Sequence, residues 1–296
     1  MHAVTFVQFC EAHGLIMGGS LIEGRWVRVK TEDKKTKRNG AYKFMGDHGF
    51  CQNHATMTQV ASWFSESCEA VVVDTEAIAA RRKAEREDRM RAIHRARAFW
   101  TDSRPLSRLH PYLAKKGLSA LGCSGLREND GFLVVPVMWG DKLLSTQTIH
   151  PDGTKRFFAG APVKAGACVI DRPGAAVTVI VEGLATGLAV FQSVRQSSVI
   201  VAFDAGNLLA VVERIRPSGS VVIAADNDHA TQARRGFNPG REKAANAAEL
   251  IGCGVAWPEG IEGTDFADML VELGQGAHRK VERTILAGAR YVAGVV

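Results

Sequence analysis

Membrane-spanning runs, secretion signals and paired cysteines are all missing from this 296-residue sequence. No apolar run approaches the roughly 20 residues that a membrane helix needs, and the amino terminus has no basic segment followed by a long apolar core. The six cysteines are scattered without a Cys-x-x-Cys pair, which is typical of reduced thiols. We therefore predict a cytoplasmic protein with no membrane segment.

Clusters of zinc ligands are equally scarce. The one compact cluster is His48-x-x-Cys51-x-x-His54, which supplies three ligands where structural zinc sites need four. A polar loop with incidental residues explains this cluster better than a metal site does. We therefore expect no zinc.

Apolar residues are abundant, and positive charge is in modest excess. Hydrophobic residues make up 46% of the chain, which is enough for two or three domains with cores of their own. The formal net charge of +6 favours anionic partners such as nucleic acids without identifying one.

Three short apolar runs, at 177–181, 199–203 and 221–225, alternate with helix-length segments. This pattern predicts parallel strands buried on both faces by crossover helices. In such sheets ligands bind where the strands end, and an acidic residue follows each of these runs. If the third strand continued past its apolar run, the two acids there would leave the same face. The acids are Glu182, Asp204, Asp226 and Asp228.

Carboxylates that converge at one sheet edge repel each other unless a cation binds between them. An all-oxygen site of this kind suits Mg²⁺ or Mn²⁺, which leave coordination positions for water and substrate phosphates. The alternative is that these acids cap helices or pair with basic side chains. Their joint spacing favours the metal site.

Four sequence blocks in order resemble the Toprim domain, and residues 112–273 as a whole resemble the Toprim DNA primases of plasmids and phages. These primases are related to the bacterial replicative primase. The segment at 111–118 resembles the helix that introduces their polymerase core, with Lys116 where arginine is usual. The blocks are Glu182-Gly-Leu-Ala-Thr186-Gly-Leu-Ala, Phe203-Asp-Ala-Gly206-Asn207-Leu, Ala225-Asp-Asn-Asp228 and Gly263-Thr-Asp265-Phe-Ala-Asp268.

The resemblance implies an α/β fold, multi-domain α+β overall. Its Toprim domain has a central, mainly parallel sheet flanked by helices, preceded by a mixed basic subdomain and a small amino-terminal α+β module. We expect a long charged helix between the first two parts, a polar basic loop at 229–240 and a helix at the carboxyl terminus. The expected divisions are 1–72 for the module, 73–104 for the linker helix, 105–172 for the basic subdomain, 173–274 for the Toprim catalytic domain and 275–296 for the C-terminal helix.

The same resemblance implies roles for the acids. Asp226 and Asp228 are metal ligands, and Glu182 is either a third ligand or the residue that handles a proton. Asp204 lines the same edge. The bacterial replicative primases carry a second acid three residues after the Glu-Gly pair, and Thr186 stands there in this chain, so the number of metals or their affinity differs.

Two further acids, Asp265 and Asp268, are either outer metal contacts or first-turn acids favoured by a helix dipole. Basic residues before and after the sheet are candidates for contacts with a template strand or nucleotides, the alternatives being a structural sheet and a plain surface loop. The predicted nucleotide- or template-binding residues are Arg127, Lys155, Arg156, Lys164, Asn207, Arg234 and Arg235.

The function that the resemblance implies is synthesis of short RNA primers on single-stranded DNA from ribonucleoside triphosphates. A Toprim nuclease and a non-catalytic single-strand-binding replication protein are the alternatives. A topoisomerase is disfavoured because none of the three tyrosines lies in a gate-domain context. Since the sequence has no Gly-x4-Gly-Lys-Ser/Thr loop, we expect a helicase or replication initiator to act in trans.

Overall fold

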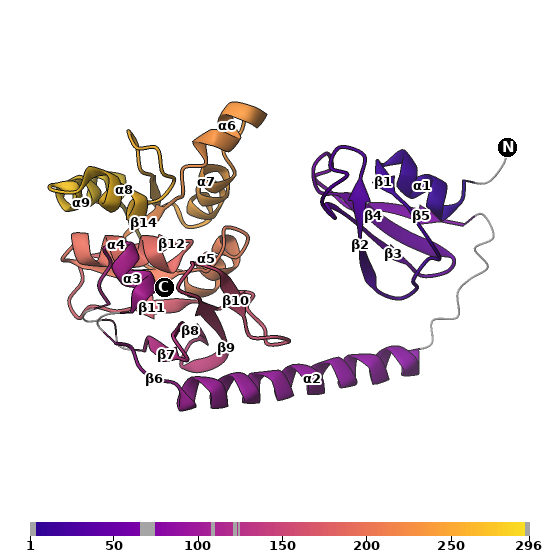
Figure 1. The fold of residues 1–296 in the computed structure, drawn as a ribbon, viewed down its shortest axis with the longest axis horizontal. Coiled ribbons are helices and arrows are strands. Elements are labelled where there is room, and N and C mark those ends of the chain that lie inside the picture. Colours follow the sequence, from indigo (N-terminus) through magenta and orange to yellow (C-terminus); the bar gives the residue numbers. More distant parts are fainter. Residues whose placement is uncertain (1–3, 66–74, 108–109, 121–122, 124, 294–296) are drawn as a thin grey trace. The chain divides into compact units, whose positions relative to one another are not determined.

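A computed structural model describes residues 4–65, 75–107, 110–120, 123 and 125–293. The chain divides into two compact units, residues 1–79 and 80–296 (Figure 1). No helix within the described residues is both long and apolar enough to cross a membrane.

The first unit is a helix packed on a five-stranded antiparallel sheet whose strands follow chain order. Helix α1 (Phe6–Ala12) begins after Thr5, which forms a capping box with Gln8 and so satisfies backbone N–H groups at the helix start. Phe6 and Cys10, one turn apart, pack into the core of this unit. The strands are β1 (Leu15–Ile16), β2 (Trp26–Thr31), β3 (Gly40–Phe44), β4 (His48–Asn53) and β5 (Ala61–Phe64).

The histidine and cysteine cluster begins in strand β4, so the prediction of a polar loop there was wrong. Because side chains alternate across a strand, Cys51 is buried in the core, hydrogen-bonded to Cys10. His48 leaves the opposite face and pairs with Asp47, with 2.7 Å between Nδ1 and Oδ1. The strand pleat therefore separates two members of the cluster.

Helix α2 (Thr75–Asp102) is the predicted long charged helix, and its second half is attached to the second unit. Its residues are exposed from Ala80 to Arg91, whereas Ile93 and Ala96 are buried. Farther along, the Arg97 side chain donates a hydrogen bond of 3.0 Å to the carbonyl of Leu143. The end of the helix therefore packs against the sheet that follows it.

That sheet is an antiparallel meander with the strand order β10-β9-β8-β7-β6. Its two longest strands, β8 (Phe132–Trp139) and β9 (Lys142–Ile149), are joined by a tight turn at Gly140, whose φ of 58° favours glycine. The short helix α3 (Pro111–Lys115) precedes the long strands, with proline at its start as expected. The remaining strands are β6 (Arg104–Pro105), β7 (Arg127–Asn129) and β10 (Lys155–Phe157).

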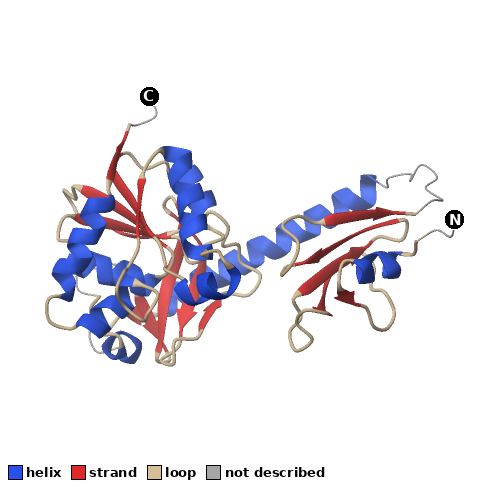
Figure 2. Cartoon of the chain, turned by 90° about the horizontal axis from the view of Figure 1, so that it is seen from above, coloured by secondary structure: helices blue, strands red, loops and turns tan. Residues whose placement is uncertain are grey.

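The largest sheet has the order β11-β13-β12-β14-β15, with β16 also paired to β14. Strands β13, β12, β14 and β15 run parallel to one another, while β11 pairs antiparallel with β13 and β16 pairs antiparallel with β14. Figure 2 shows helices around this sheet. The strands are β11 (Cys168–Ile170), β12 (Val177–Val181), β13 (Ser197–Val201), β14 (Gly219–Ala224), β15 (Gly254–Ala256) and β16 (Arg290–Val292).

Helices bury both faces of this sheet, as the unbroken apolar runs predict. Val179 and Val181 of β12 face a core shared with α4, α8 and α9, whereas Ile180 between them faces a core shared with α5 and α7. The mixed α and β content that we predicted is confirmed. The helices are α4 (Leu184–Ser193), α5 (Leu208–Ile215), α6 (His229–Arg235), α7 (Pro239–Ile251), α8 (Phe266–Leu273) and α9 (Ala277–Gly288).

Two expectations about local structure were wrong. The expected loop at 229–240 contains α6, which has no buried residue and therefore no apolar pattern to reveal it. The expected C-terminal helix ends at Gly288, and residues 290–292 form β16 instead. Pairing with β14 decides that outcome, since three residues carry no strand signal of their own.

Close contact between β15 and α9 requires glycine at position 254. A Cβ there would lie 1.7 Å from the carbonyl oxygen of Gly288. We expect Gly254→Ala to push α9 away from the sheet and lower the free energy of unfolding by about 1–3 kcal/mol, measured by urea denaturation. Gly18→Ala, at a site with no atom within 4 Å, is the control and should change little. Equal stability of both variants would contradict the packing argument.

Candidate active site

Four acidic side chains lie where the parallel strands end. Glu182 directly follows β12, and Asp204 follows β13 by three residues. Strand β14 ends at Ala224, so the two later acids lie in a loop beyond it, and Asp228 is the residue that precedes α6. Their proximity thus comes from this loop and not from strand alternation, which was the reason we gave for their sharing a face.

The loop at 225–228 is fixed by hydrogen bonds from three directions. The backbone N–H of Asn227 donates to the carbonyl of Thr264 at 2.7 Å, and its side-chain amide donates to Pro258 at 2.9 Å. On the other side, the buried Asn238 accepts a bond from the backbone N–H of Asp228 and donates one to the Asn227 side chain. The acids are therefore held by backbone contacts that leave their carboxylates unconstrained.

Gly240 is the closest neighbour of this loop on α7. A Cβ at this position would lie 2.4 Å from the carbonyl oxygen of Asp226 and 3.4 Å from a carboxylate oxygen of Asp228. Only glycine allows the first turn of α7 to approach the acids this closely.

Asp226 is in the least favourable environment of the four acids. Burial, followed by the negative charges of Glu182, Asp265 and Asp228, raises the pKa of Asp226 to about 8. Its Oδ1 atom is buried and has no hydrogen-bond partner. A buried carboxylate without a partner is costly, and a bound cation relieves both the desolvation and the repulsion.

Glu182 experiences the same field. Burial raises the pKa of Glu182, and the charges of Asp204 and Asp228 add to that effect, while a hydrogen bond from the backbone N–H of Ala205 and the charge of Lys155 oppose it. Lys155 lies close by, since a Cβ on Gly183 would be 3.5 Å from its Nζ atom. One lysine thus faces several carboxylates, which leaves the site with an excess of negative charge.

Asp204 sits on an unusual turn. The preceding residue, Phe203, has a φ of 73°, which is rare and strained for a bulky side chain. Its ring packs edge-on against Phe157 of β10, with 5.7 Å between centroids. The backbone N–H of Asn207 donates a hydrogen bond of 3.0 Å to Oδ1 of Asp204, which holds this side chain. Strained backbone of this kind concentrates at functional sites.

Asp265 and Asp268 occupy the start of α8. Asp265 is its N-cap and accepts a hydrogen bond of 2.8 Å from the backbone N–H of Asp268. Asp268 accepts one from the backbone N–H of Thr264 and pairs with Lys116, at 3.4 Å. Burial raises the pKa of Asp265, whose charge in turn contributes to the field at Asp226. These acids therefore cap α8 and also belong to the electrostatics of the site.

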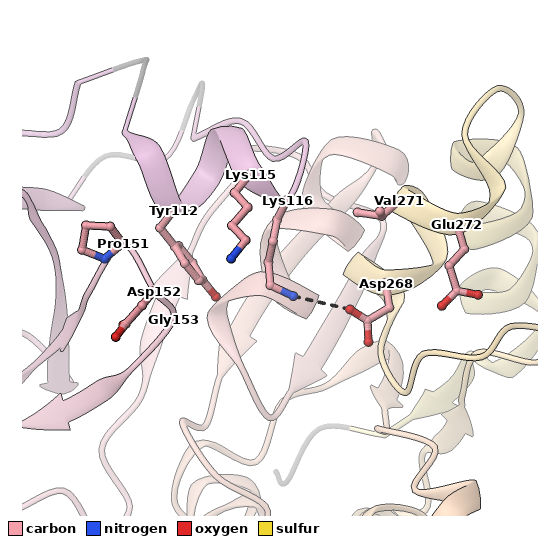
Figure 3. A pocket seen from close by; sticks show the side chains of 9 residues that line it. All are labelled: Tyr112, Lys115, Lys116, Pro151, Asp152, Gly153, Asp268, Val271 and Glu272. Carbon is pink, nitrogen blue, oxygen red and sulfur yellow. Dashed lines mark hydrogen bonds and ion pairs between the residues drawn. The ribbon is translucent and has the colours of Figure 1, made fainter.

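A pocket of about 250 Å³ lies beside these two acids. Figure 3 shows its walls, with Lys115 and Lys116 from the α3 region on one side and Asp268 and Glu272 of α8 on the other. Buried Tyr112 forms part of the wall, and burial together with the nearby acids raises its pKa to about 12. Sequence reasoning noted Lys116 only as a departure from a motif and gave it no role in the site.

The carboxylates fit a divalent cation through their charge and through a buried oxygen that has no hydrogen-bond partner. Within the described ranges, no three Asp, Glu, His or Cys side chains stand close enough to form a ligand set as they are. The orphaned Oδ1 of Asp226 and the mutual repulsion of Asp226, Glu182 and Asp228 nevertheless match what Mg²⁺ or Mn²⁺ would neutralise. These three residues are the ones that would hold it.

The predicted nucleotide- or template-binding residues fall into two groups. Arg156, Lys164, Arg234 and Arg235 are exposed, as Lys155 is, and can reach an anionic ligand. By contrast, two other candidates are engaged in holding the fold. These two are Arg127 and Asn207.

Arg127 closes the end of α2. One of its guanidinium nitrogens donates to the carbonyls of Trp100, Thr101 and Ser103, and the group lies 3.9 Å from the Trp100 ring centroid. Positive charge at a helix carboxyl end is favourable. The side chain is thus occupied by structural contacts.

Asn207 is buried and ties the segment at 165–166 to β13. Its side-chain oxygen accepts from the N–H of Ala165 at 2.7 Å, and its amide nitrogen donates to the carbonyls of Gly166 and Ala202. Every polar group of this amide has a backbone partner, so its contribution is to position the turn that carries Asp204.

Comparison with known proteins identifies a family for the central segment. Residues 177–276 match the family model for the Toprim domain. The chain is 31% identical over 278 residues to DNA primase TraC of Escherichia coli, an alignment that covers 86% of this chain and 26% of that protein. The chain therefore spans about a quarter of the length of this relative.

Two solved structures are also similar at lower identity. The primase fragment of the bacteriophage T7 primase-helicase protein is 15% identical with a TM-score of 0.43, covering 62% of this chain and 80% of that one. The DnaG primase catalytic domain bound to single-stranded DNA is 14% identical with a TM-score of 0.40, covering 70% and 84%.

We expect Asp226→Asn to stabilise the metal-free protein. The pKa of Asp226 is 3.8 in the unfolded chain and about 8 in the folded protein. The unfolded chain therefore releases this proton first as the pH rises, and the folded protein loses stability between those two pH values. Asparagine removes this cost, on the order of 2–4 kcal/mol at pH 7. Melting temperatures from pH 5 to 8 in EDTA should diverge as pH rises. Parallel curves for wild type and variant would refute the argument, and Asp141→Asn, at an exposed turn, is the control.

Asn207→Ala tests whether this residue supports the fold or binds nucleotide. The change leaves one buried N–H and two carbonyl groups without a partner, so we expect a loss of roughly 3 kcal/mol in the free energy of unfolding. Urea denaturation measures it, with Lys164→Ala at an exposed neighbouring position as the control, expected within about 0.5 kcal/mol of wild type. Unchanged stability with weakened nucleotide binding would instead assign Asn207 to the ligand.

Proposed function

We propose that this chain, a Toprim-domain protein related to the DNA primases, synthesises short RNA primers on single-stranded DNA. The observation that carries the proposal is the cluster of Glu182, Asp226 and Asp228 where parallel strands end, with a buried carboxylate oxygen that has no partner. Because the chain spans about a quarter of its matched relative, this activity is inferred for the site and not transferred from the whole of that protein.

Nucleotidyl transfer depends on positioning and on neutralising charge. A divalent metal, when bound, supplies activation of the attacking 3′-hydroxyl and stabilisation of the leaving pyrophosphate. Asp226 and Asp228 would hold it, and Glu182, whose pKa is raised, is placed to act as a further ligand or to accept a proton.

Basic side chains near the acids supply the complementary charge for the substrates. Lys155 lies against Gly183, next to Glu182, and can bind a phosphate of an incoming ribonucleoside triphosphate while limiting repulsion among the acids. Arg156 and Lys164 are exposed and are suited to the phosphates of a template strand. We propose that a replicative helicase or initiator brings the chain to its template.

Charge-neutral substitutions of the acids should abolish primer synthesis. We expect Glu182→Gln and Asp228→Asn, and the stabilised Asp226→Asn, to lower RNA product formation on single-stranded DNA with Mg²⁺ or Mn²⁺ by on the order of 100-fold or more. The assay supplies four ribonucleotides, one of them radiolabelled, and resolves products on a gel. Asp141→Asn is the matched control that keeps the acids intact.

Two outcomes would overturn the proposal. Metal-dependent shortening of the template in place of new RNA would identify a nuclease. Primer synthesis that persists in all three variants would show that these carboxylates are not the metal site. Since Asp226→Asn is expected to be more stable than wild type, loss of activity in that variant cannot be attributed to unfolding.

A further inference from the structure

A second pocket, of about 360 Å³, opens between α6, the start of α7 and β15. Its size falls within the range of small-molecule sites, about 300–1,000 Å³. Phe237, Arg241 and Trp257 line it, together with Asn238, Gln232 and Glu242. The Arg241 guanidinium lies 3.9 Å from the centroid of the Trp257 ring, so two planar groups are already stacked in the wall.

Phe237 is held in the pocket wall without being packed in a core. It is 40% exposed, and it stands between Gly236, which ends α6 at a φ of 77°, and the buried Asn238. Asn238 donates hydrogen bonds to Asn227 and Gln232 and accepts them from Asp228 and Arg241. The backbone on either side of the ring is thus fixed, while part of the ring remains open to solvent.

We propose that this pocket binds one unpaired base of single-stranded DNA, with Phe237 and the Arg241–Trp257 pair as the stacking surfaces. Aromatic rings and guanidinium planes are the groups on which unpaired bases stack, and the contact tolerates any base. The inference rests on the proposed function only in taking single-stranded DNA as the partner.

The charges around the pocket favour a base inside and phosphates outside. Glu242 lines the pocket itself and would repel a phosphate placed there. The exposed arginines of α6, Arg234 and Arg235, lie outside the lining and can contact the flanking phosphates. Figure 1 shows α6 projecting beside α7 at the margin of the second unit.

The pocket also borders the acidic loop. Asn238, in the pocket wall, accepts a hydrogen bond of 3.2 Å from the backbone N–H of Asp228. Asn238 thus connects the stacking surface to the candidate catalytic acids. A base held here would place the neighbouring nucleotides of the strand beside the carboxylates. The pocket is therefore suited to guiding a template strand toward the site.

The experiment compares binding of two strands of equal length, oligo-dT and a fully abasic oligonucleotide. Fluorescence anisotropy with the full chain in EDTA, without nucleotides, measures affinity independently of primer synthesis. We expect wild type to prefer oligo-dT by about 10-fold or more, and Phe237→Ala to reduce that preference severalfold. Phe237→Tyr should restore it, and Leu209→Ala, another exposed apolar position, should leave it unchanged.

The dependence of affinity on salt distinguishes contacts with the base from contacts with the phosphates. Phe237→Ala should leave the dependence of affinity on salt unaltered, because no phosphate contact is lost. Arg234→Ala should reduce the slope of log affinity against log salt by about 0.7 while keeping the preference for bases.

Several results would overturn the inference. One is an equal preference for oligo-dT over the abasic strand in wild type and Phe237→Ala. Another is a loss of this preference in Leu209→Ala as large as that in Phe237→Ala, and a third is no binding of oligo-dT by the wild-type chain. Tighter binding of free ATP than of oligo-dT, with ATP affinity lost in Phe237→Ala, would assign the pocket to a nucleotide. Since no metal or nucleotide is needed, failure of the primase assay leaves these results interpretable.

Discussion

The repulsion among carboxylates at the end of a parallel sheet is the constraint on which the second unit depends. Glu182 follows β12, whereas Asp226 and Asp228 share the loop after β14, and burial together with nearby negative charge raises the pKa of Glu182 and of Asp226. A fold gains nothing in stability from this arrangement and bears its cost at neutral pH. Such a cost persists where a ligand offsets it, which is why the acids point to a cation and to phosphate chemistry.

The loop that carries Asp226 and Asp228 is fixed through its backbone and through neighbouring amide side chains. Asn227 is bonded to residues 258 and 264, and Asn238 joins the same loop to α7, so segments distant in sequence converge on two residues. Gly240 permits the closest of these approaches. The rigidity of this loop belongs to amides and backbone groups, whose hydrogen bonds do not use the carboxylate oxygens of Asp226 and Asp228.

This division explains what the sequence could and could not predict. Buried parallel strands followed by acids are a local pattern, and it located Glu182 and Asp226 without a structure. Arg127 bonds to carbonyls 24 to 27 residues away, and Asn207 bonds to backbone groups 41 and 42 residues away, which no local pattern encodes. Helix α6 escaped prediction for a related reason, since it buries no side chain and so shows no periodicity.

The basic side chains of the chain are distributed differently from its candidate catalytic acids. The chain carries a net charge of +6, yet acidic side chains outnumber basic ones at the candidate site, so most of its basic side chains lie outside that site. Arg127 is occupied at a helix end, whereas Arg156 and the arginines of α6 are exposed, and the exposed Lys155 lies beside Glu182. Exposed basic side chains attract a polyanion, whereas the cluster of acids repels one in the absence of a cation. Under the proposed function, a nucleic-acid strand would therefore bind first through these basic side chains, and chemistry would begin only with the cation in place.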